Sequence, residues 1–166
     1  MQNCVVDLQS LITPTLNLIP ANIERLGRHL YSQHYCGVSG HQAHDGDSVT
    51  FFEERFDHAF FKSSDPRGGG RKDGIDIDRV QRVLWIGRLI QGSVYNSECL
   101  QVPNKRPDKP DTRLYIINSE MYVVWLEPLE VGGWVFSSAY KPMARQIKAY
   151  RKSGKKIWEY GWRIAP

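Results

Sequence analysis

The segment FFEERFDHAF, residues 51–60, places a histidine among charged side chains at helical spacing. His58 lies four residues after Glu54 and three after Arg55, so these side chains would share one side of a helix, where the carboxylate can orient or charge the imidazole. Imidazole transfers protons near neutral pH, and a guanidinium can bind phosphate through two hydrogen bonds. His58 is therefore a candidate general acid or base, and Arg55 a candidate phosphate ligand. The same spacing also occurs on helices whose charged face is only solvated.

A second group of candidates ends the segment WVFSSAYK, residues 134–141. Its alternation predicts a strand. Ser138, Tyr140 and Lys141 would stand at the end of that strand, where a sheet can present polar groups to a ligand. The plainer interpretation is a strand that simply ends in polar residues.

Four zinc-competent side chains occur in HYCGVSGHQAH, namely His34, Cys36, His41 and His44. Their spacing matches no standard zinc-finger pattern, so no metal site is predicted and zinc binding stays an open question. The chain contains no G-x-x-x-x-G-K-[ST], G-x-G-x-x-G or G-x-S-x-G motif. These absences remove support for NTPase, dinucleotide-binding and hydrolase-elbow functions, and no cofactor is predicted.

Helices must position the candidates near His58. Apolar residues at helical spacing predict helices over residues 20–36 and 49–62, and a third from a cap at Asp76 or Asp78 to Gly92. The inward-facing residues would be Phe52, Phe56, Ala59 and Phe60 in the second helix and Ile77, Val80, Leu84 and Ile90 in the third. Between these two helices, SSDPRGGGRKDG at residues 63–74 is the clearest loop, either a flap near a site or a linker.

Alternating residues after Asp111 predict the strands. Residues 114–117 and 121–126 form a hairpin with a two-residue turn, and residues 134–140 form a third strand. Residues 99–102 are a fourth strand, and KIWEYGWRI at residues 156–164 is a possible fifth. The prediction is an α+β fold with N-terminal helices packed on a small antiparallel sheet of about four strands.

Length and composition favour a single domain. The chain has 166 residues, 41% hydrophobic and 24% charged, which suffices for one core. We expect residues 1–48 to be a helical extension and residues 49–166 the core domain. The sequence has no apolar run long enough to span a membrane and no basic signal-peptide start, and its three cysteines (Cys4, Cys36 and Cys99) form no CxxC pair. A cytoplasmic protein with reduced thiols is expected.

Positive charge is concentrated at the C-terminal end. The net charge is +4, and residues 141–166 carry eight basic residues against Glu159 alone. Aromatic residues at 150, 158, 160 and 162 are interleaved with them. Such a segment can follow a phosphate backbone and stack on bases. Alternatively, it is a solvated helix face followed by a segment whose aromatics enter the core.

Four motifs occur in a characteristic order along residues 50–150. These are F-x-E-R-F-x-H (52–58), R-x-Y-I (113–116), Y-V-V-W-L (122–126) and W-x-F-S-S-A-Y (134–140). This order resembles the barnase/EndoU/colicin/RelE-like ribonuclease superfamily, especially members found in phages and mobile elements. Those proteins pack N-terminal helices on a four-stranded antiparallel sheet whose final core strand often ends in [ST]-A-[YF], matched here by Ser138, Ala139 and Tyr140.

The resemblance implies metal-independent RNA cleavage, in which a 2′-hydroxyl attacks the adjacent phosphate. His58 would be the general acid or base and Arg55 a phosphate clamp. Ser138 would donate a hydrogen bond to the phosphate, and Tyr140 would donate a hydrogen bond or stack on a base. Two features depart from the superfamily pattern: Ser138 stands where Thr is common, and residues 103–112 form a long loop.

Positive charge adds Arg113, Lys141 and Arg145 as further candidates for substrate binding, and Glu54 is grouped with them as the helical neighbour of His58. The expected partner is RNA, whether tRNA, rRNA or mRNA. A toxin or effector of this type can also have an antitoxin or immunity protein. Two other functions stay open: a non-catalytic nucleic-acid-binding module that uses the basic, aromatic C-terminal region, and a protein-interaction domain.

Overall fold

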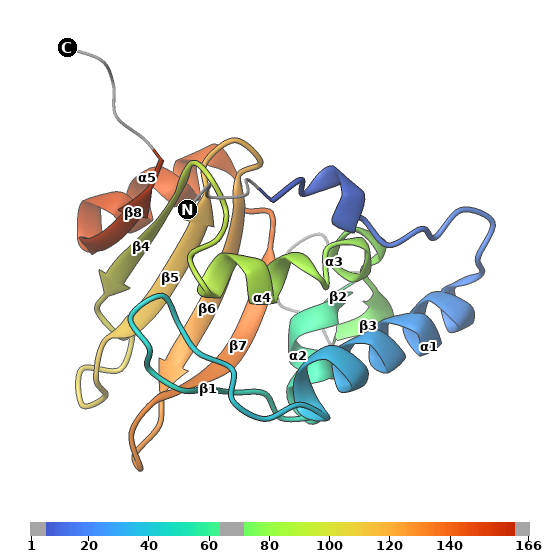
Figure 1. The fold of residues 1–166 in the computed structure, drawn as a ribbon, viewed down its shortest axis with the longest axis horizontal. Coiled ribbons are helices and arrows are strands. Elements are labelled where there is room, and N and C mark those ends of the chain that lie inside the picture. The colour runs from blue at the N-terminus through green and yellow to red at the C-terminus, as the bar shows by residue number, and fades with distance from the viewer. Residues whose placement is uncertain (1–5, 64–71, 162–166) are drawn as a thin grey trace.

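In the computed structural model, which describes residues 6–63 and 72–161, the chain forms an α+β fold around a mixed six-stranded sheet (Figure 1). The helical elements are η1 (Gln9–Leu11), α1 (Pro20–Tyr31), η2 (Ser32–Cys36), α2 (Arg55–Phe60), α3 (Ile77–Gln81), α4 (Trp85–Ile90) and α5 (Ala144–Ser153). The strands are β1 (Val49–Thr50), β2 (Phe61–Ser63), β3 (Lys72–Ile75), β4 (Ser97–Val102), β5 (Thr112–Ile117), β6 (Tyr122–Pro128), β7 (Trp134–Tyr140) and β8 (Lys155–Tyr160). No described helix has the length and apolarity needed to cross a bilayer.

The α+β class is confirmed. The observed sheet, however, has six strands instead of about four, and it is mixed instead of fully antiparallel. The strand order is β1-β7-β6-β5-β4-β8, and β2 and β3 form a separate hairpin. Strands β4 to β7 are the predicted antiparallel strands, and β8 is the possible fifth. The addition is β1, which pairs in parallel with β7 through Val49–Trp134 and Thr50–Val135.

The first predicted helix is confirmed. Helix α1 begins at Pro20, in the first turn where its missing N–H costs nothing, and continues through the π-helical turn η2 to Cys36. Tyr31 is fully buried among the rings of Tyr35, Phe51, Phe56, Phe60 and Phe136. The N-terminal segment therefore belongs to the same hydrophobic core as the sheet.

The second predicted helix, over residues 49–62, is mostly wrong. Only Arg55–Phe60 is helical, because Val49 and Thr50 pair with β7 and the chain returns to strand at Phe61. β-Branched and aromatic residues favour strands, and the pairing with β7 decides the outcome here. Phe52, predicted to face inward, is 44% exposed, whereas Phe56, Ala59 and Phe60 are buried as predicted.

The third predicted helix is divided into α3 and α4. Its cap is confirmed, since the Asp76 side chain accepts a hydrogen bond from the backbone N–H of Arg79 at 3.3 Å. A turn separates the two short helices, and Ile77 is exposed instead of inward-facing because it occupies the first, outer turn. Residues 64–71 of the predicted loop lie outside the described residues, and Lys72–Ile75 is strand β3 rather than loop.

The predicted hairpin and third strand are confirmed. Strand β7 has the predicted bounds. The turn between β5 and β6 spans residues 118–121 instead of two residues, because Ile117 pairs with Tyr122. Met121 in this turn has a positive φ of 50°. Cys4 and the part of the predicted C-terminal strand beyond Gly161 lie outside the described residues.

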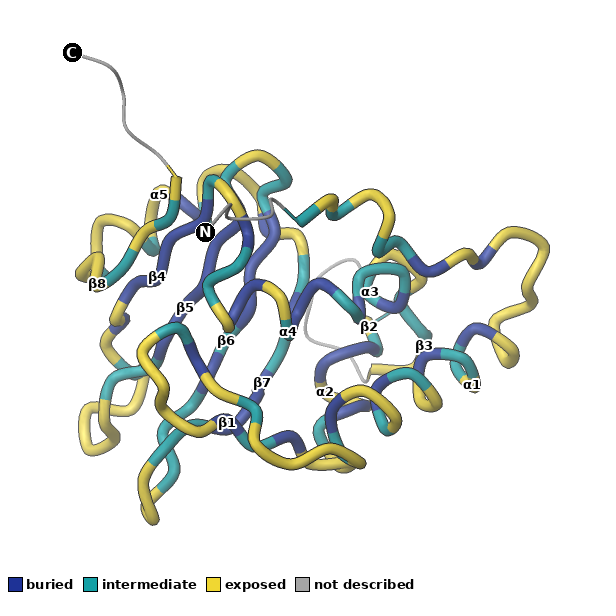
Figure 2. Tube along the Cα trace, in the orientation of Figure 1, coloured by how far each residue is buried: buried dark blue, intermediate teal, exposed yellow. Residues whose placement is uncertain are grey.

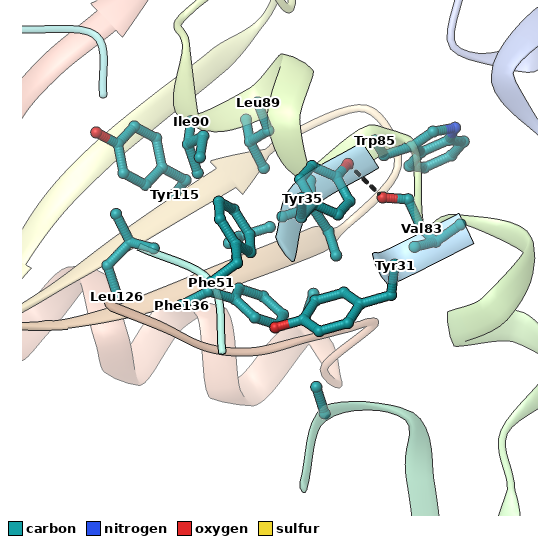
Figure 3. Close-up of a cluster of buried hydrophobic side chains, with 14 of the residues drawn as sticks. Tyr31, Tyr35, Phe51, Val83, Trp85, Leu89, Ile90, Tyr115, Leu126 and Phe136 are labelled. Carbon is teal, nitrogen blue, oxygen red and sulfur yellow. Dashed lines mark hydrogen bonds between the residues drawn. The ribbon is translucent and has the colours of Figure 1, made fainter. Parts of the chain in front are cut away.

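Most of β4 to β7 is buried (Figure 2). The buried side chains form two clusters, one on each face of the sheet. On the face crossed by α4, aromatic residues dominate, and the Tyr35 hydroxyl donates a hydrogen bond to the carbonyl of Val83 at 2.6 Å (Figure 3). Helix α5 covers part of the other face, where Ile147 packs on Leu100, Leu114 and Val123. Helix α5 packs mainly against β4, which is separated from β7 by β5 and β6.

Candidate active site at the free edge of β7

Helix α2 lies beside β7 because its apolar side is buried in the aromatic core (Figure 1). Phe56 stacks on Phe60 at 4.7 Å between ring centroids, and Tyr31 contacts both rings. β1 pairs with the first two residues of β7, and no other described segment pairs with this edge of the strand. Arg55 and His58, on the other side of α2, are thereby held near that edge.

Arg55 is joined to the sheet by Glu127, near the end of β6. Arg55 Nη2 lies 3.1 Å from Glu127 Oε2, and the Ser137 hydroxyl donates to Glu127 Oε1 at 3.1 Å. Ser137 is the extra residue of a β-bulge, because Trp125 pairs with Ser138 while Leu126 pairs with Phe136. Bulges often redirect side chains next to active sites. Here the bulge brings a serine to the carboxylate that holds Arg55.

His58 is exposed on α2 among several charges. Partial burial lowers its pKa below the usual value of about 6.5. The positive charges of Lys72, Arg55 and Arg79 lower this pKa further, whereas Glu127 raises it. At pH 7 the imidazole is therefore mainly neutral and able to accept a proton.

The β2–β3 hairpin brings Lys72 next to His58. Strand β2 follows α2 directly, and Ser63 pairs with Lys72 as the chain returns. Lys72 Nζ donates a hydrogen bond to the backbone carbonyl of His58. Partial burial and the charge of Arg79 lower the pKa of Lys72.

Arg79 connects this cluster to Tyr140. Its Nη1 donates to the carbonyl of Ala59 at 2.8 Å, its Nε lies 3.3 Å from Asp76, and its guanidinium lies 5.2 Å from the centroid of the Tyr140 ring. The Tyr140 hydroxyl accepts a hydrogen bond from Trp125 Nε1 at 3.1 Å and lies 3.2 Å from the Tyr150 hydroxyl. Tyr140 is thus fixed in orientation, with its ring against a cation.

The structure brings only some of the predicted candidates together. His58 and Arg55 share the charged cluster with Glu127, and Tyr140 and Lys141 line a pocket that continues from it through Arg79. Ser138 is partly exposed on β7, opposite Trp125. Arg145 is exposed in the first turn of α5. Glu54 is exposed and forms no hydrogen bond or ion pair with His58 in the described part of the chain, and the carboxylate that raises the pKa of His58 is that of Glu127.

The side chain of Arg113 is paired with two carboxylates that are not part of the His58 cluster. Its Nη2 is 2.7 Å from Asp45 Oδ2 and 3.1 Å from Asp47 Oδ2, and its guanidinium lies 4.3 Å from the centroid of the Trp134 ring. Arg113 pairs across the sheet with Leu126, the neighbour of Glu127, but its guanidinium is engaged by Asp45, Asp47 and Trp134 instead of by residues of the His58 cluster. With two carboxylates bound, Arg113 links residues 45–47 to β5 and is not free to act as a phosphate ligand.

The four zinc-competent residues, His34, Cys36, His41 and His44, do not form one cluster. His41 Nε2 lies 3.0 Å from the carbonyl of Tyr35, His44 Nδ1 lies 2.6 Å from the hydroxyl of Tyr115, and His34 is exposed. Within residues 6–63 and 72–161 no three His, Cys, Asp or Glu side chains form a group that could hold a metal ion.

Three residues of the cluster were not predicted: Lys72, Arg79 and Glu127. Arg79 is recognisable in the sequence as polar on the third helix, but nothing local relates it to His58. Lys72 and Glu127 depend on the β2–β3 hairpin and on the β6–β7 pairing, which are long-range features. Comparisons with family models, with curated proteins and with solved structures give no significant match for this chain.

Proposed function

We propose that this protein is a metal-independent endoribonuclease, a toxin or effector acting on cytoplasmic RNA, whose active site is the cluster around His58. One observation carries this proposal: three cations and one carboxylate are held around the helical turn that bears His58. Lys72 donates to the carbonyl of His58, Arg79 donates to the carbonyl of Ala59, and Arg55 pairs with Glu127 at 3.1 Å. Cleavage by a 2′-hydroxyl needs a proton acceptor, a proton donor and positive charge around the phosphate, and side chains of this cluster can supply all three.

In the first half of the reaction, His58 accepts the proton of the 2′-hydroxyl as that oxygen attacks phosphorus. A neutral imidazole at pH 7 is suited to this role. Arg55 and Arg79 stabilise the charge that develops on the non-bridging oxygens, and Ser138 donates a hydrogen bond to the phosphate.

In the second half, the bond from phosphorus to the 5′-oxygen breaks and this oxygen takes up a proton. Lys72 is the proposed donor, since its lowered pKa makes its ammonium more acidic than that of an ordinary lysine. The products are a 2′,3′-cyclic phosphate and a 5′-hydroxyl. Glu127 keeps Arg55 in place through their ion pair. Its negative charge also raises the pKa of His58 and so stabilises the imidazolium formed in the first half.

A second candidate function is RNA binding without cleavage. Helix α5 carries Arg145, Lys148 and Lys152 at positions that share one helix face, and all three are exposed. The other cations of this region are partly engaged, since Arg151 and Lys156 lie 2.7 and 3.1 Å from the buried carboxylate of Glu98. The α5 face therefore suits contact with a phosphate backbone in either function.

Expression under tight induction tests the enzyme against the binding module. Wild type should stop growth and leave discrete fragments of total RNA on a denaturing gel, whereas His58→Ala should do neither. His34→Ala, at an exposed histidine in η2, is the matched control and should behave like wild type. Both variants should melt like wild type. Intact RNA and equal growth in all three cultures would overturn the nuclease and leave the binding module.

A further inference from the structure

A pocket of about 100 Å³ lies between α3 and the end of β7. Its lining residues are Asp76, Asp78, Arg79, Arg82, Tyr122, Tyr140 and Lys141. Three cations therefore line one small space, two from α3 and its C-terminal cap and one from the residue after β7. It has room for several water molecules or one tetrahedral anion.

Each cation of the pocket has a carboxylate partner, but two of these three ion pairs are long. Asp76 is occupied, since it caps α3 and pairs with Arg79. Asp78 points to solvent, with its side chain 78% exposed, and reaches Arg82 only at 3.9 Å. Lys141 has an equally distant partner, Glu120, at 3.9 Å. Arg82 and Lys141 are thus the cations with the weakest carboxylate contacts.

Arg82 is also incompletely hydrogen-bonded. Its side chain is 15% exposed, its guanidinium lies 5.1 Å from the centroid of the Trp85 ring, and its Nη1 donates to the carbonyl of Asp78 at 3.0 Å. Its Nε is buried and has no hydrogen-bond partner among the described residues. A buried donor without an acceptor is destabilising, so a small rotation that offers Nε–H and Nη–H to one anion would be favourable.

We propose that this pocket binds the RNA phosphate next to the scissile one. The inference rests on the proposed nuclease function and extends it: Arg79 lines the pocket and donates a hydrogen bond to the carbonyl of Ala59, the residue after His58, so the two phosphate positions adjoin one guanidinium and can be filled by neighbouring phosphates of one strand. The substrate is then an oligonucleotide with at least two phosphates, and a dinucleoside monophosphate, which has one, is a poor substrate.

Cleavage of a dinucleoside monophosphate and of the trinucleoside diphosphate that extends it measures the contribution of the pocket. Wild type should cleave the longer substrate with kcat/KM about tenfold higher or more, as expected for a charge-assisted contact. The double variant Arg82→Gln, Lys141→Gln should bring this ratio close to one. Arg25→Gln, at an exposed arginine of α1, is the control and should keep the wild-type ratio. An unchanged ratio in the double variant would overturn the proposal.

Binding of inorganic phosphate tests the pocket independently of the proposed nuclease activity, because this measurement requires no RNA cleavage. In ¹H–¹⁵N spectra of wild type, phosphate should shift the Arg82 Nε–H signal in a saturable manner, and Lys141→Gln should weaken that shift. A shift in a protein that cleaves no RNA would support the anion pocket and overturn the proposed function. RNA cleavage with no shift and an unchanged ratio would retain the nuclease and overturn the pocket.

Discussion

His58 depends on a carboxylate that is distant in sequence. Its helical neighbour Glu54 is exposed and forms no hydrogen bond or ion pair with it among the described residues, whereas Glu127 raises the pKa of the imidazole against the effect of three cations. The presence of a histidine and an arginine on one side of a short helix could be predicted from spacing. The identity of the carboxylate could not, because it depends on how β6 is placed beside α2.

The pKa of His58 should report this arrangement directly. In wild type it should lie below about 6.5, since burial and then the nearby cations disfavour the charged form. Glu127→Gln removes a negative charge and should lower the pKa further, whereas Lys72→Gln removes a positive charge and should raise it. Titration of the imidazole by NMR measures all three. Identical values in the three proteins would refute the proposed charge cluster.

Arg113 should be important for stability. Its ion pairs with Asp45 and Asp47 are half-exposed on the carboxylate side, so Arg113→Gln should cost about 2 kcal/mol of unfolding free energy at pH 7. Burial opposes ionisation of Asp45, but the hydrogen bond from Arg113 lowers its pKa overall. Stability from a lowered carboxyl pKa is present above the unfolded value and disappears as pH falls through the folded one. In urea unfolding, the difference in unfolding free energy between wild type and Arg113→Gln should therefore shrink below about pH 4. A difference that does not change with pH would contradict this account.

Among the secondary-structure elements, β7 and α2 show what the sequence could and could not predict. The alternation of residues 134–140 matched β7 because a strand with one face on an aromatic core needs that pattern. The stripe of Phe56, Ala59 and Phe60 identified α2, but its first predicted residues belong to β1. A two-residue strand has no pattern of its own, and only its partner β7 defines it.

The pairing of β1 with β7 should depend on Gly133. This residue has a φ of +78°, and a Cβ here would lie 2.5 Å from Ser48 Oγ and 2.9 Å from the Ser48 carbonyl oxygen. Gly133→Ala should therefore destabilise the protein by about 3 kcal/mol, from backbone strain and overlap together. It should also accelerate hydrogen exchange at the Trp134 amide, which donates to the Ser48 carbonyl.

Gly132→Ala is the matched control for this prediction. Gly132 also has a positive φ, of +95°, but a Cβ there meets nothing within 4 Å. The variant should cost only about 1 kcal/mol, from backbone strain, and should leave the Trp134 amide protected. Equal losses in the two variants would show that the close approach to Ser48 is not what holds β1 in the sheet.

At the scale of the whole molecule, the basic C-terminal region serves two purposes. Arg151 and Lys156 compensate the buried Glu98 between α5 and the sheet, and Trp158 packs partly on the core against His44. The exposed cations of α5 face solvent instead. Composition could show that this region is basic and aromatic, but not which charges are used within the fold, because that depends on a buried acid from β4.

The exposed face of α5 should contribute to binding and not to chemistry. Changing Arg145, Lys148 and Lys152 to Gln should reduce the slope of log affinity against log salt by about 2 for a 2′-deoxy oligonucleotide, which the enzyme cannot cleave. The rate of RNA cleavage at saturation should stay unchanged. A control that changes Lys105, Arg106 and Lys109, exposed in the β4–β5 loop, should alter the slope less. Equal slopes in both triple variants would contradict a specific role for α5.

The most direct measurement is cleavage of a defined RNA oligonucleotide by the purified protein in EDTA, with identification of the product ends. The proposed reaction predicts 2′,3′-cyclic phosphate and 5′-hydroxyl ends from wild type, with cleavage at a given position abolished by a single 2′-deoxy nucleotide there. Cleavage should also be lost in His58→Ala, while His34→Ala retains it. An oligonucleotide that stays intact with wild type, or one that is cut equally well by His58→Ala, would contradict the central claim that the cluster around His58 is a ribonuclease active site.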